Sequence, residues 1–126
     1  MKCKMKAKTP LNPTEDVDKV IKALSNMFDF EQLEIGDNYV QVTGEGESLQ
    51  KLKQSLEKRK IRNTARKILL KSAHDRVIFF KLNKQTAYSG VVNFAEDKIS
   101  PLGEIKVKIE TRNAEGFIDW IAPLQD

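Results

Sequence analysis

The sequence predicts a single α+β domain, residues 1–126, in which helices cover a mostly antiparallel sheet. Three observations support this fold class. Lysines alternate with apolar residues from position 2 to position 9, apolar residues recur at helical spacing from Val17 to Phe28, and strand-like and helical segments follow one another in mixed order. The connections are short, and the chain has no internal repeat and no linker, so we expect one layered domain.

The first third of the chain is predicted to form a strand, a helix and a hairpin. Residues 2–9 have the period-two pattern of a strand with one buried and one wet face. Asn12 is predicted to cap the helix, with Pro13 at its first position and Glu15 completing a capping box. Strand-like residues 33–35 and 39–42 flank the turn sequence at 36–38, which predicts the hairpin.

The rest of the chain is predicted to mix helices and strands. Ser48 is expected to cap a helix with leucines on one face, and Asn63 to cap a second helix after a bend near residue 60. Residues 77–82 are rich in β-formers on both faces, which predicts a central strand. A short helical turn at 83–89, a break at Gly90, strands at 91–95 and 105–111, and a helix at 114–121 ended by Pro123 complete the prediction.

The composition is typical of a globular protein of the cytoplasm. Apolar residues make up 40% and charged residues 32% of the chain. The longest apolar run covers only residues 77–80, and the N-terminus lacks an apolar signal, so we expect neither a membrane span nor secretion. One cysteine and one histidine argue against an internal disulfide and against common zinc sites. We therefore expect no metal and no cofactor.

The charge is unevenly distributed along the chain. The net charge is only +4, but residues 51–71 carry nine basic side chains against one acid, and lysines occupy positions 2, 4, 6 and 8. The remaining residues together carry a net charge of −8. If these segments fold compactly, the molecule has a positive and a negative side, and the positive side could attract a polyanion.

No set of residues predicts catalysis. Ser72, His74 and Asp75 lie within one turn, too close in sequence for an oriented relay. The loop at 44–48 joins a strand to a helix, but its two glutamates would repel a phosphate. We expect Cys3 to pack in the core together with five aromatic residues, namely Phe28, Phe79, Phe80, Phe94 and Trp120.

Six short strings span nearly the whole chain: Pro13-Thr14-Glu15-Asp16, Thr64-Ala65-Arg66, Leu82-Asn83-Lys84-Gln85, Val92-Asn93-Phe94, Ser100-Pro101-Leu102-Gly103 and Asp119-Trp120-Ile121-Ala122-Pro123. In this order and spacing they resemble a family of small archaeal proteins of uncharacterised function that is catalogued as RNA-binding. The resemblance implies a fold like that of the ribosomal large-subunit protein five, with a curved antiparallel sheet and helices packed on one side. Asn63 stands where the family has Asp, and Thr86 and Tyr88 stand where it has Ala and Phe.

Together, the charge and the resemblance predict a non-catalytic RNA-binding protein. The expected contacts with the phosphate backbone come from a basic helical patch and the segment after residue 82, namely Lys58, Arg59, Arg62, Arg66, Lys67 and Lys84. Arg66 could instead pair with Asp119 or with a helix C-terminus. The alternative function is a protein-interaction or structural domain, a homodimer that uses strand edges or a helical face, without nucleic acid. An enzyme of unknown class is the third alternative.

Overall fold

The five strands form one antiparallel sheet in the computed structural model, which describes residues 2–95 and 102–124. The strands are β1 (Lys4–Pro10), β2 (Gln32–Ile35), β3 (Tyr39–Glu45), β4 (Val77–Asn83) and β5 (Glu104–Glu110). Their order across the sheet is β2-β3-β1-β5-β4, and every neighbouring pair is antiparallel. The predicted α+β class is confirmed, whereas the likeness to the ribosomal protein stays a prediction.

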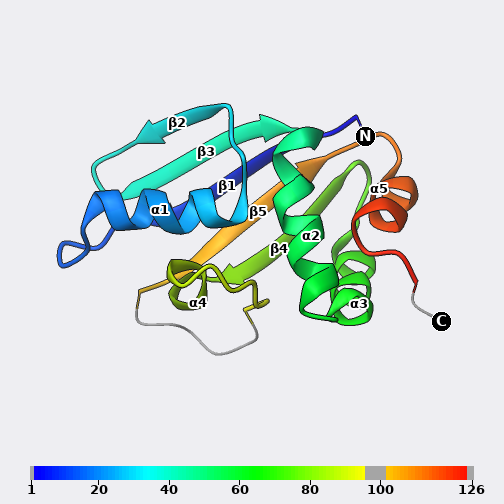
Figure 1. Ribbon diagram of the computed structural model, residues 1–126. Helices are drawn as coiled ribbons and strands as arrows, with labels where there is room; N and C mark the ends of the chain where they lie inside the picture. The colour runs from blue at the N-terminus through cyan, green and yellow to red at the C-terminus, as the bar shows by residue number, and fades with distance from the viewer. Residues whose placement is uncertain (1, 96–101, 125–126) are drawn as a thin grey trace.

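The helices cover one face of this sheet (Figure 1). They are α1 (Val17–Met27), the 3-10 turn η1 (Gly46–Leu49), α2 (Gln50–Lys58), α3 (Arg62–Ser72), α4 (Lys84–Tyr88) and α5 (Ala114–Ile121). In β1 the buried residues alternate strictly with exposed lysines, and β3, β4 and β5 bury alternate residues in the same way. The helical layer therefore leaves the opposite face of the sheet open to solvent.

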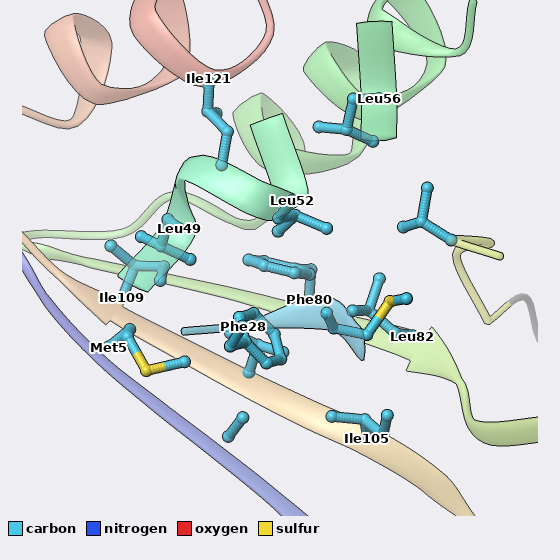
Figure 2. Close-up of a cluster of buried hydrophobic side chains, with 14 of the residues drawn as sticks. Met5, Phe28, Leu49, Leu52, Leu56, Phe80, Leu82, Ile105, Ile109 and Ile121 are labelled. Carbon is cyan, nitrogen blue, oxygen red and sulfur yellow. The ribbon is translucent and has the colours of Figure 1, made fainter. Parts of the chain in front are cut away.

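The core lies between the sheet and the helices, as Figure 2 shows. The strands contribute inward-facing side chains such as Met5, Phe80 and Ile109, and the helical layer contributes Leu52 and Ile121. Phe28, at the end of α1, is completely buried in this cluster. Burial of this apolar surface is the main favourable contribution to folding.

The helix starts differ from those that the sequence predicts. Asp16, not Asn12, caps α1, because its carboxylate accepts a hydrogen bond from the Asp18 N–H. The capping-box bond between the Asn12 N–H and Glu15 forms, but it closes a separate turn before the helix. Ser48 lies within η1 and Asn63 lies within α3, and neither side chain caps its helix. The predicted bend does occur, since Lys60 takes a left-handed conformation (φ 57°) between α2 and α3.

The prediction of a central strand at 77–82 is wrong, because β4 lies at the edge of the sheet. Its inward side chains are buried, but Phe79 points to the open face and is 56% exposed, so the prediction that it packs in the core is also wrong. The predicted strand at 91–95 does not form. Phe94 makes one isolated bridge with Leu82, and the Ala95 N–H donates to the Lys81 carbonyl. This segment therefore partly covers the outer edge of β4.

Truncation of a core leucine should destabilise the protein strongly. Leu52 is 1% exposed, so Leu52→Ala is expected to lower the free energy of unfolding by about 2–5 kcal/mol through lost burial and a residual cavity. Leu70 on α3 is 48% exposed, and Leu70→Ala is the matched control, expected to change stability by about 0.5 kcal/mol or less. Urea denaturation measures both, and equal losses would contradict the assignment of the core.

Candidate nucleic-acid interface

The helical residues expected to bind phosphate have different surroundings. Lys58 at the end of α2 and Lys67 on α3 are exposed, and Arg62 is half-buried. Arg59 donates to the Val92 carbonyl at 3.2 Å and also to the Asn93 side chain. Only some of these cations therefore keep all their donors available for a ligand.

Arg66 makes the structural contacts that the alternative interpretation names. Its guanidinium pairs with the Asp119 carboxylate at 2.7 Å and donates to the Ala122 carbonyl at 3.3 Å. Ala122 follows the last residue of α5, so Arg66 holds the end of that helix against α3. A phosphate would have to compete with Asp119 for this side chain.

Lys84 is not at the surface, which corrects the expectation that it contacts RNA. The residue is completely buried, and its ammonium pairs with the Glu15 carboxylate at 2.7 Å. The ammonium also donates to the Pro10 and Leu102 carbonyls, so its donors are used inside the protein. This cluster joins the end of β1, the turn before α1, the start of α4 and the segment before β5.

The pKa values in this cluster follow from its contacts. Burial alone would raise the pKa of Glu15, but hydrogen bonds from Lys84, Tyr88 and Asn12 lower it to about 2. Burial and the neighbouring Glu15 carboxylate raise the pKa of the Tyr88 hydroxyl, which donates to Glu15. Glu15 is therefore ionised in the folded protein under all ordinary conditions.

Removal of the Lys84 ammonium should destabilise the fold. Lys84→Ala leaves the Glu15 carboxylate buried without its cation, which is expected to cost about 3–5 kcal/mol of unfolding free energy. Lys81→Ala removes an exposed lysine three residues away and should cost much less. Urea denaturation of both variants is the measurement, and a Lys84→Ala variant as stable as Lys81→Ala would contradict the buried ion pair.

Stability should also fall at acidic pH through Glu15. Its folded pKa of about 2 lies below the ordinary value of 4.5, so the unfolded chain binds a proton more readily. The contribution is complete above pH 4.5 and is lost as the pH falls toward 2. Unfolding free energies measured at pH 6 and pH 3 should differ less in Glu15→Gln than in the wild type; an equal pH dependence would contradict this role.

The open face of the sheet carries a compact group of lysines that was not predicted from the sequence. In the register of the strands, Lys6 on β1 lies opposite Lys108 on β5, which lies opposite Phe79 on β4. In the next row Lys8 lies opposite Lys106, which lies opposite Lys81. Five lysines and one phenylalanine thus occupy two rows across three adjacent strands, and we call these six residues the lysine grid.

Three of the cross-strand pairs in the lysine grid are pairs of like charge: Lys6 with Lys108, Lys8 with Lys106, and Lys81 with Lys106. Like charges directly opposite one another destabilise a sheet. Lys108 is relieved by Glu110 at 3.2 Å, and Lys81 is near Glu104 at 3.9 Å. No ion pair found within residues 2–95 and 102–124 involves Lys6, Lys8 or Lys106. The repulsion at the centre of the grid is therefore only partly offset by the protein itself.

The lysine grid also lines an open hollow of about 350 Å³ on the sheet. All six residues of the grid contribute to its lining, and the area between them is mostly apolar. Towards the other end of β1, Lys4 lies opposite Glu45 on one side and Glu110 on the other, so it has an acidic neighbour on both adjacent strands. Among the lysines of the strands, those of the grid are therefore the ones with no acidic residue directly opposite them.

One feature of this face, its exposed lysines, could be predicted from the sequence. The alternation of lysines with apolar residues at 2–8 predicts a wet lysine row, and Lys106 and Lys108 alternate in the same way. The pairing of these lysines across β1 and β5 joins segments about a hundred residues apart. It depends on the order of the strands, which the local alternation does not show.

Comparison with known proteins places the chain in a family. A family model described as RNA binding matches residues 4–111. A UPF0201 protein of Methanothermobacter thermautotrophicus is 45% identical over 95% of this chain and 91% of its own length. The chain belongs to the UPF0201 family. A second member, from Sulfurisphaera tokodaii, is 43% identical over 90% of this chain and 82% of its own length.

Solved structures of the UPF0201 family have the same fold. The structure of the UPF0201 protein from Methanococcus jannaschii superposes with a TM-score of 0.81 at 36% identity, covering 98% of this chain and 95% of that one. The family description names RNA binding and no catalytic activity. Within the described part of the chain, no helix has the length and apolar character needed to cross a membrane.

Proposed function

We propose that this protein binds RNA through the open face of its sheet, with the lysine grid contacting the phosphate backbone. The membership of a family described as RNA binding supports the ligand class. The proposed position of the RNA rests on the three like-charge lysine pairs on adjacent strands. A phosphate placed between two such lysines would replace their repulsion by two attractive contacts.

The same arrangement makes the expected affinity dependent on salt. Each lysine that neutralises a phosphate releases condensed counterions, so the binding constant falls as the salt concentration rises. Lys6, Lys8 and Lys106 contribute most to this term, because the described part of the chain offers them no carboxylate partner. Lys81 and Lys108 contribute after they exchange a glutamate for a phosphate.

The helical residues remain candidates for additional contacts. Lys58 and Lys67 are exposed on the helical layer and could extend the path of a long RNA around the molecule. Arg59 and Arg66 already donate to protein acceptors, which reduces what a phosphate can gain from them. We therefore assign the principal contacts to the sheet.

Loss of two lysines from the grid should weaken RNA binding and its dependence on salt. For Lys6→Gln/Lys106→Gln, the slope of log K against log salt concentration is expected to fall by about 1.4, or about 0.7 for each lost phosphate contact with a single strand. Fluorescence anisotropy with a labelled RNA at several salt concentrations measures both the affinity and the slope.

The matched control removes the same amount of charge from the helical layer. Lys58→Gln/Lys67→Gln has the same net charge as the grid variant, so any general effect of charge is equal in the two proteins. With a short single-stranded RNA, which cannot reach from the sheet around to the helical layer, the control is expected to bind nearly as well as the wild type. A larger loss in the control than in the grid variant would place the interface on the helices and would contradict the proposal.

A homodimer without nucleic acid is the second candidate function. It is favoured by one observation: β2 lies at an edge of the sheet and carries Leu33 and Ile35, which are 42% and 53% exposed. Light scattering of the RNA-free protein tests it, with Leu33→Lys as the disrupting variant. A stable dimer that this variant dissociates, together with an absence of RNA binding at low salt, would favour this candidate.

A further inference from the structure

We propose that the RNA held by this face is single-stranded and that one of its bases stacks on the ring of Phe79. This inference rests on the proposed function, since it assumes that the lysine grid binds the RNA backbone. It adds the conformation of the RNA and a second kind of contact, between an aromatic ring and a base.

The Phe79 side chain is 56% exposed on the open face, so it buries little apolar surface within the protein. Its neighbours on the same strand and in the core, Phe80 among them, point to the helical side and are buried, whereas the Phe79 ring points to the open face. It lies beside Lys108 across the strands and two residues before Lys81, so cations border it on two sides. Proteins that bind single strands combine aromatic rings, which stack on bases, with cations, which bind the phosphates. Phe79 and its neighbouring lysines provide both kinds of contact side by side.

Tyr39, at the start of β3, is a second aromatic residue near the lysine grid, but its ring already contacts other parts of the protein. The Lys8 ammonium lies 4.4 Å from the centre of its ring, within the range of a cation–π contact. The ring also lies directly over Gly36, where an added Cβ would come within 2.1 Å of it. Because both contacts use the ring, Phe79 is the aromatic residue of this face that a base can cover.

The size of the lysine grid favours a single strand over a duplex. Two rows across three strands span about 7 Å along the strands and about 10 Å across them. Domains that bind double-stranded RNA contact about 16 base pairs over two successive minor grooves, which needs a longer surface. The bases of a duplex are also paired and stacked on one another, so none is free to cover Phe79. Sheet surfaces with exposed aromatic residues, by contrast, stack two or three unpaired bases.

The first experiment compares the affinity of Phe79 variants for two RNAs. The probes are a labelled oligouridine of about eight nucleotides and a blunt duplex of about 16 base pairs, both at low salt. Phe79→Ala is expected to weaken binding of the oligouridine by roughly 5- to 150-fold, the factor that corresponds to loss of one stacked base. Leu70→Ala, which removes a similarly exposed apolar side chain from α3, is the control and should bind like the wild type.

Two further variants separate stacking from simple loss of apolar surface. Phe79→Leu keeps an apolar side chain without an aromatic face and should lose affinity almost as Phe79→Ala does. Phe79→Trp keeps an aromatic face and should retain affinity, and its added indole should change in fluorescence on binding. The native Trp120 lies on α5 and packs beside Phe117, so the wild type provides the background signal.

The outcomes distinguish this inference from the proposed function. Wild-type affinity of Phe79→Ala and Phe79→Leu for the oligouridine would overturn the stacking, while a large effect of Lys6→Gln/Lys106→Gln would still support the lysine face. Tighter binding of the duplex than of the oligouridine would overturn the single-stranded ligand. If the wild type bound neither RNA at low salt, the proposed function would fail, and this inference with it.

Discussion

The helices of this protein cover only one face of a five-stranded sheet, and the character of the other face follows from that constraint. In a strand, alternate side chains point to opposite faces, so every inward core residue of β1, β4 and β5 is matched by an outward one in contact with water. The hydrogen-bond register then places these outward residues about 5 Å from one another on neighbouring strands. Lys6 and Lys108 are held together by the backbone, although their charges repel. The gathering of lysines on this face is thus a consequence of strand order.

The cations of this protein have two kinds of role, which burial and partners separate. Lys84 is inside the molecule, where its ammonium joins Glu15 to the carbonyls of Pro10 and Leu102 and holds four segments together. Arg66 fixes the end of α5 through Asp119. The lysines of the grid stand on the open face with few partners, and their arrangement contributes nothing to the core. Charge at a position therefore says little about RNA binding until its partners are known.

Much of the fold could be predicted from local patterns, because they report which side of an element is buried. The alternation at 2–9, the helical spacing at 17–28 and the hairpin at 36–38 all correspond to observed elements. The position of β4 could not be predicted, because strand order depends on pairing between distant segments. The apolar run at 77–80 also does not show whether one face of the strand is covered or both. The same limit applies to Lys84, whose partner Glu15 lies 69 positions away in the chain. The lysine grid required the register of β1 with β5 in the same way.

RNA is proposed to occupy the open face of the sheet and not the helical layer. The most direct measurement is a titration of the isotopically labelled protein with a short single-stranded RNA, followed residue by residue in NMR spectra of the backbone amides. The largest shifts are expected on β1, β5 and β4, around Lys6, Lys106 and Phe79, and they should diminish at high salt. Shifts concentrated on α2 and α3, around Lys58 and Lys67, with the strands unchanged, would contradict it.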